Sequence, residues 1–463
     1  MKQIDVLPDD ALLLVFDFYM IINPSYNGKT ETEAWQSLVH VCRRWRTLVF
    51  ESPRRLNLRL FCTPKTPARD TLDVWPALPL LINGSMASTG PDNVIAALGR
   101  SNRVRQVILY LAGWQLEQVL APMQEPFPEL TDLRLFADDE TPPIIPDSFL
   151  DGSASRLQSF LLSGIPFPGA PKLLLSANHL SYLELINVPH SGYISPEAAL
   201  TLLCASTSLD TFTLEFQSHL SYTEWENPIP PPPKRFILPA LDQFRFKGVV
   251  EYLEDFVSFL DAPQLNLLFV TFFNQIDFDC PRLAQFINRT ISFGALDEAH
   301  VEFNDEFASI KLCYQTSMSG FYDLLINISC REPDWQLSSI EQVCNFSFQP
   351  LSTVEDLYID HEYSQLVWKN DAIENTLWLQ LLLPFVVVKN IYVSKEFAPG
   401  IAVALIELVG AGLTVLPSLQ NIFVEGLEPS GPLRENLGLF VTARQLSRRP
   451  VVICDWDKDS DKG

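Results

Sequence analysis

The sequence predicts an α/β protein in which a short helical segment precedes a long array of alternating strands and helices. Three observations predict this fold class: a six-residue apolar pattern that recurs about twelve times, prolines that precede several of its copies, and a change of charge near residue 60. With 463 residues and 47% hydrophobic side chains, the chain can bury a large core.

Residues 1–60 differ in charge and in pattern from the rest of the chain. They carry 8 basic and 7 acidic side chains, a net charge of +1, which leaves −24 for the remainder. Pro8 followed by two aspartates is a helix-start signal, and it predicts a helix over Ala11 to Ile22. A second helical run is expected from Ala34 to Phe50, after a polar insert from Asn23 to Glu33.

The first of these helices is apolar nearly all round. Its apolar side chains form two stripes, which are Ala11, Val15, Phe18 and Ile22, and Leu12, Phe16 and Tyr19. A helix with two apolar faces must be buried on two sides, and a sixty-residue unit cannot cover both. We therefore expect a protein partner for this helix.

The run from Leu7 to Phe16, followed by Val41-Cys42-Arg43-Arg44-Trp45-Arg46 and Leu48, resembles the F-box over roughly residues 4–55. F-box domains are three-helix adaptors that dock on the Skp-type linker of cullin-RING ubiquitin ligases. The resemblance implies that docking uses Leu7, Pro8, Leu12, Phe16, Val41, Cys42 and Trp45. The insert Asn23–Glu33 is longer than the family's usual connection, so the register of the middle helix stays open.

Residues 61–463 repeat a pattern of apolar-x-x-apolar-x-apolar, with successive starts 23 to 34 residues apart, near the period of leucine-rich repeats. The pattern predicts a strand in each copy. The copies begin at Val104, Leu130, Leu157, Leu180, Leu209, Leu241, Leu265, Leu296, Phe321, Val354, Val388 and Leu419.

Helical stretches fill the gaps between these strands, and prolines two residues before the pattern, such as Pro128 and Pro239, end the preceding helix. The expected helices are Pro196–Ala205, Glu251–Leu260, Pro281–Thr290, Ile373–Leu383 and Pro399–Gly410. Strand–helix units that cannot bury their own apolar faces must stack on their neighbours. We expect about twelve irregular repeats in a leucine-rich-repeat-like solenoid with a parallel concave sheet.

An F-box followed by leucine-rich-type repeats is a familiar pairing in substrate receptors of SCF-type ligases. The strings Arg54–Leu60 and Thr71–Leu80 resemble the F-box-like families of mushroom-forming fungi. The resemblance implies a non-catalytic receptor whose F-box docks a Skp-type adaptor and whose repeats bind a protein target that the sequence does not name. The alternative is an interaction scaffold whose F-box-like segment only caps the solenoid.

Composition and motifs argue against several other classes of function. A net charge of −23 disfavours nucleic acid and anionic membranes as partners. The eight cysteines never form CxxC pairs, which suits a reducing compartment, and the start of the chain lacks a signal-peptide pattern. We therefore expect a cytoplasmic or nuclear protein without a membrane-spanning segment.

The sequence contains no GxSxG, GxxxxGK[ST] or strand-GxGxxG-helix motif, so we expect no enzyme and no cofactor. His361-Glu362 begins like HExxH but lacks the second histidine, and His300-x-Glu302 lacks the PCxxC of zinc deaminases, so no metal is expected. The acidic tail from Asp455 reads as solvated. Pro228–Pro233 fits either a ligand for an aromatic groove or a stiff spacer, and the spacer is favoured.

The alternation of strand side chains predicts where a target binds. The last two apolar positions of each pattern point to the core, so the residues just before them lie on the concave surface. In the last three repeats this rule predicts a column of Tyr358, Tyr392 and Phe423 beside Asp356, Asn390 and Asn421. Aromatic rings beside polar groups are typical of binding hot spots. The alternative is that irregular repeats shift the register and bury these rings as core.

Overall fold

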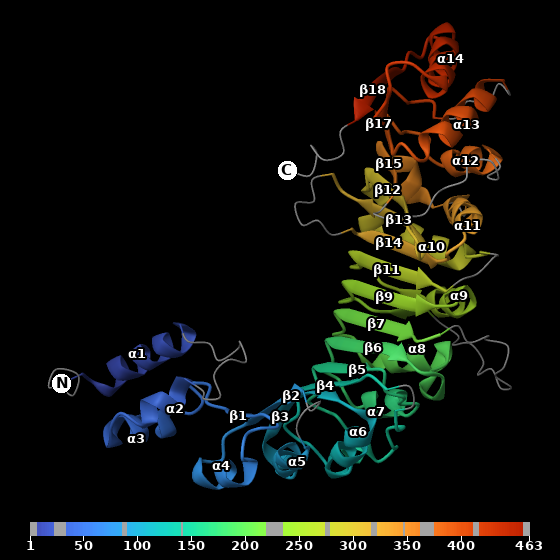
Figure 1. The fold of residues 1–463 in the computed structure, drawn as a ribbon. Helices are drawn as coiled ribbons and strands as arrows, with labels where there is room; N and C mark the ends of the chain where they lie inside the picture. Colours follow the sequence, from blue (N-terminus) through green and yellow to red (C-terminus); the bar gives the residue numbers. More distant parts are fainter. Residues whose placement is uncertain are drawn as a thin grey trace. The chain divides into compact units, whose positions relative to one another are not determined.

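The computed structural model describes residues 7–22, 34–85, 90–139, 142–218, 235–273, 278–315, 322–345, 348–361, 375–410 and 416–456. Within these ranges the protein is mixed α/β, with mostly parallel β-structure and fourteen α-helices (Figure 1). The insert Asn23–Glu33, the polyproline run Pro228–Pro233 and the tail beyond Trp456 lie outside the described residues. The chain divides into two compact units, Met1–Ile194 and Ser195–Gly463.

The first unit begins with three helices, α1 (Asp9–Ile22), α2 (Ala34–Val39) and α3 (Arg43–Glu51). The single run expected from Ala34 to Phe50 is therefore split. The split occurs because Cys42 has an extended backbone and its sulfur accepts a hydrogen bond from the Trp45 N–H, which starts a new helix. Strand architecture begins at Leu60, and the predicted domain boundary near this residue stays a prediction.

Six parallel strands follow in sequence order in the first unit. They are β1 (Leu60–Cys62), β2 (Leu80–Ser85), β3 (Val104–Leu111), β4 (Asp132–Ala137), β5 (Ser159–Ser163) and β6 (Tyr182–Val188). The connecting helices are α4 (Ala68–Val74), α5 (Asp92–Leu98), α6 (Gly113–Leu120) and α7 (Ala170–Leu174). The apolar pattern did not predict β1 and β2.

In the second unit the strand order is β7-β9-β11-β14-β13-β12-β15-β16-β17-β18. The strands are β7 (Thr211–Phe216), β9 (Gln243–Gly248), β11 (Leu267–Phe272), β12 (Glu298–Phe303), β13 (Phe307–Cys313), β14 (Leu324–Ser329), β15 (Asp356–His361), β16 (Asn390–Val393), β17 (Asn421–Glu425) and β18 (Val452–Trp456). A small separate pair joins β8 (Phe236–Ile237) to β10 (Leu260–Asp261).

The helices of the second unit gather on one side of its strands (Figure 1). They are α8 (Pro196–Ala205), α9 (Val250–Ser258), α10 (Pro281–Arg289), α11 (Pro333–Asn345), α12 (Asn375–Leu382), α13 (Ala398–Gly410) and α14 (Pro432–Leu446). Where the structure describes both ends, the helices expected from the sequence begin and end within about two residues of these bounds. Helix ends commonly vary by this much.

The core lies between the strands and these helices. The last two apolar residues of all twelve patterns lie on strands and are buried, as predicted. Burial alternates along strands such as β12, β16 and β17, where every second residue stays partly exposed. The sheet of the second unit therefore has a helix-distal face, defined as the side turned away from α9–α14.

The parallel sheet expected from the repeats is interrupted at β12–β14. Strand β13 runs antiparallel to both neighbours, and β14 rather than β12 lies beside β11. The reason is the turn after Phe303, where the Asn304 side chain accepts hydrogen bonds from the backbone N–H groups of Glu306 and Phe307. A turn this short closes a hairpin, because a parallel crossover needs a dozen or more residues.

Among the described residues, no helix is long and apolar enough to span a membrane.

Candidate functional site: two binding surfaces

The first candidate surface is an aromatic column on the helix-distal face. Strands β12, β15, β16 and β17 are in register, which places His300, Tyr358, Tyr392 and Phe423 side by side. Successive ring centroids lie 4.5, 4.3 and 4.5 Å apart with interplanar angles of 8°, 7° and 7°. The column predicted from the sequence is thus present, and His300 extends it by one ring.

A polar ladder of Asp356, Asn390 and Asn421 runs beside the column. The Asn390 side-chain amide donates to Asp356 Oδ1 at 2.6 Å, and the Asn421 amide donates to Asn390 Oδ1 at 2.7 Å. Side-chain amides suit this role because each can donate to one neighbour and accept from the next. The ladder runs across β15, β16 and β17, three of the four strands of the column, and the two together bring all six residues predicted for target binding side by side.

The column is half-buried, and Trp456 covers part of it. The Trp456 ring, at the end of β18, lies 5.4 Å from Tyr392 and 6.1 Å from Tyr358 with tilted or edge-on geometry. Because the stacked rings turn their faces to one another, a ligand would meet ring edges. Trp456 was not predicted, because no strand was expected after Val452. Since alternate residues of a strand share a face, Trp456 lies on the same face as Val452.

The surroundings of the column are acidic. Burial raises the pKa of Asp356, helped by the nearby carboxylates of Glu298, Glu355 and Asp297. Burial likewise raises the pKa of Asp323 and of the Tyr358 hydroxyl. A surface with this excess of acids favours neutral or basic ligands over acidic ones.

The raised pKa of Asp356 predicts how stability depends on pH. The folded protein holds the Asp356 proton more tightly than the unfolded chain does. The extra stability that this proton gives the fold is complete below the usual pKa of 3.8 and is lost as pH rises through the raised pKa. Asp356→Asn removes the buried charge and should raise the melting temperature at pH 7 while changing it little near pH 3.8. Thermal scans across pH test this, with exposed Asp138→Asn as control, and a lower melting temperature at pH 7 would contradict it.

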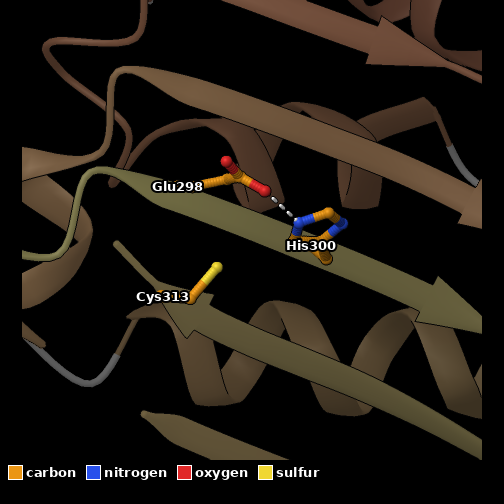
Figure 2. A group of neighbouring side chains, drawn as sticks. All are labelled: Glu298, His300 and Cys313. Carbon is orange, nitrogen blue, oxygen red and sulfur yellow. Dashed lines mark hydrogen bonds and ion pairs between the residues drawn. The ribbon is translucent and has the colours of Figure 1, made fainter. Parts of the chain in front are cut away.

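Three side chains with metal-binding donor atoms meet at one end of the column. Figure 2 shows Glu298 and His300 on β12 and Cys313 on β13, with His300 Nε2 2.6 Å from Glu298 Oε1. Burial, followed by the charge of Glu298, raises the pKa of the Cys313 thiol to about 12. Sequence reasoning did not find this group, because Cys313 joins the others only through the unexpected antiparallel strand.

The second candidate surface lies on α1. Leu12 and Phe16 are 1% and 0% exposed, and the Phe16 ring lies 4.8 Å from that of Trp45. By contrast Leu14, Val15 and Phe18 are 63%, 50% and 65% exposed, and their spacing places them on one side of the helix. We call these three residues the docking face. The helix has the two apolar faces expected, one packed inside and one outside.

The residues assigned to docking by the F-box resemblance divide into exposed and buried positions, and none of them is one of the three residues of the docking face. Leu7, Pro8 and Val41 are exposed, and Cys42 and Trp45 are partly exposed, so a partner can reach them. Leu12 and Phe16 are in the interior, where they support α1 from beneath. Arg44 fixes the start of the helix, since its guanidinium donates to the Leu7 carbonyl and to Asp9 Oδ1, both at 2.6 Å.

An aromatic cluster ties the three helices to the first strand–helix unit. Trp35 is fully buried, its ring centroid lies 5.1 Å from that of Trp75 at the end of α4, and its indole N–H donates to the Arg59 carbonyl at 2.9 Å. Phe50 and His40 also contact the Trp75 ring edge-on. The helical segment is therefore packed against the end of α4 and the chain just before β1, through side chains outside the docking face.

No family model matches the chain, and no curated protein matches it significantly.

Proposed function

We propose that this protein is the substrate-recognition subunit of an SCF-type cullin-RING ubiquitin ligase, acting in the cytoplasm or nucleus. In this proposal the helices α1–α3 are an F-box that docks a Skp-type adaptor, and the strand–helix repeats form a leucine-rich-repeat-like solenoid that binds the target. The observation that carries the proposal is the docking face, three exposed apolar side chains on the helix whose sequence resembles the F-box.

The alternative function, an interaction scaffold capped by the helical segment, is supported by the Trp35 cluster. The cap alternative gives Trp35, Phe50 and Trp75 a role in packing the helical segment, but it gives the docking face no role. Exposed apolar side chains gathered on one helix face are typical of a protein–protein interface. The ligase proposal accounts for both sides of the segment, and we prefer it for this reason.

For the target, we propose that the aromatic column and the polar ladder form the binding surface. The column supplies apolar area from rings that are already ordered, so binding loses little side-chain entropy. The ladder supplies hydrogen-bonding groups beside it, and the carboxylates around it favour a neutral-to-basic target segment.

Co-expression with a Skp-type adaptor, followed by size-exclusion chromatography, tests the proposal. The wild-type protein should elute with the adaptor, and a Leu7→Ala/Pro8→Ala variant should elute with less of it. If both proteins elute alone, the segment is a cap and the receptor function fails.

A further inference from the structure

We propose that Glu298, His300 and Cys313 form a binding site for one zinc-type dication, independently of any role in a ligase. The three donor atoms all lie within 4.8 Å of one another. Glu298 and His300 are two residues apart on β12 and so share its helix-distal side, and Cys313 is the register partner of Glu298 on β13. Three donors from two adjacent strands thus converge on one point (Figure 2).

The donor set matches the chemistry of Zn²⁺. Thiolate sulfur, imidazole nitrogen and carboxylate oxygen are its usual ligands, and three protein ligands leave a fourth position for water or another group. Ca²⁺ and Mg²⁺ prefer all-oxygen sites, so thiolate and imidazole select against them. On binding, the Cys313 thiol would release its proton to solvent and the sulfur would bond the metal.

The orientation of His300 favours a metal site over a catalytic triad. A cysteine–histidine–carboxylate triad uses one ring nitrogen for the thiol and the other for the carboxylate. Here Nε2, the ring nitrogen that bonds Glu298, is also the one on the side of Cys313, and the other ring nitrogen is turned away from both residues (Figure 2). Stacking on Tyr358 at 4.5 Å holds the ring in this orientation, as second-shell contacts do at metal sites.

The charge around the three residues is a second, independent observation. Asp297 and Asp323 lie close enough to act electrostatically on Cys313. The Oδ2 atom of Asp323 is buried and has no hydrogen-bond partner among the described residues. Buried oxygen atoms without a partner are rare, and each calls for an explanation. A dication at this point would offset the negative charge and would clamp β12 to β13 at the end of the aromatic column.

Cobalt titration of the full-length protein tests the site. The reduced, metal-stripped protein should bind one equivalent of Co²⁺ with a thiolate-to-cobalt charge-transfer band, and Zn²⁺ should displace it. Cys313→Ser should remove the band. His300→Phe keeps a ring to stack on Tyr358 but removes the nitrogen donors, and it should weaken Zn²⁺ binding at least about 100-fold.

The matched control is Cys454→Ser, which changes a partly exposed thiol on β18 and should leave the titration unchanged. Circular dichroism checks that each variant is folded. If Cys313→Ser does not fold, Glu298→Gln replaces it in the comparison, with weaker binding expected. No charge-transfer band in the wild-type protein, or a band that persists in both the Cys313 and His300 variants, would overturn the proposal.

Discussion

Replacing Trp35 with alanine should lower the free energy of unfolding of the first unit by about 3–5 kcal/mol, the range for large aromatic side chains in cores. The change opens a cavity between α2, α3 and the end of α4, where the Trp35 ring meets Phe50 at 6.1 Å and Trp75 at 5.1 Å. It also removes the donor to the Arg59 carbonyl. An unpaired carbonyl adds to the loss if water cannot reach it.

Urea unfolding followed by circular dichroism measures this effect. Trp114→Ala is the matched control, because Trp114 lies on α6 of the same unit and is exposed. We expect the control to change stability by no more than about 0.5 kcal/mol. Equal effects of the two substitutions would show that the aromatic cluster does not hold the helical segment on the first repeats.

Replacing both Tyr358 and Tyr392 with alanine should abolish target binding and also destabilise the second unit by roughly 2–4 kcal/mol, because aromatic pairs contribute about 0.5–1.5 kcal/mol each beyond area burial. The double change removes three ring stacks of the column and two contacts with Trp456. Fully exposed side chains would leave stability nearly unchanged, whereas these rings are half-buried and stacked on their neighbours.

The control for this loss is Tyr110→Ala/Phe136→Ala. These two rings on β3 and β4 of the first unit stack at 4.3 Å and 7°, so their removal breaks a matching pair away from the column. On an array of basic, neutral and acidic peptides, wild type and control should bind the neutral and basic ones, and the Tyr358/Tyr392 variant should bind none. Undiminished binding by that variant at a temperature where it is folded would exclude the column as the target surface.

Period-two alternation made the column predictable. Once Ile391 and Val393 are assigned to the core, Asn390 and Tyr392 must face the other way, and parallel register brings their equivalents on β15 and β17 alongside. The proposed metal site was not predictable in this way, because Cys313 reaches Glu298 only through the hairpin at Asn304. A single Asx turn reverses one strand and changes which residues are neighbours.

The helical segment shows a similar limit. The sequence of α1 indicates two apolar faces but not which is buried, since that depends on where the Trp45 ring packs. The contact between Trp35 and Trp75 joins residues forty positions apart with no local pattern to signal it. Local periodicity therefore predicts elements and their faces, and packing between distant elements decides which face remains available.

Binding of a Skp-type adaptor to the docking face is the step on which the proposed function depends, and a Val15→Glu/Phe18→Glu variant isolates it. Both side chains are exposed, so the variant should fold normally. Two carboxylates buried at an interface should weaken adaptor binding at least about 100-fold. Leu439→Glu/Leu446→Glu is the matched control, since both leucines are exposed on helix α14.

Titration calorimetry with the purified adaptor gives the affinities. We expect tight binding by the wild type and by the Leu439/Leu446 control, and at least about a 100-fold loss in the Val15/Phe18 variant. No binding by the wild type, or equal binding by the wild type and the Val15/Phe18 variant, would show that the docking face does not bind the adaptor.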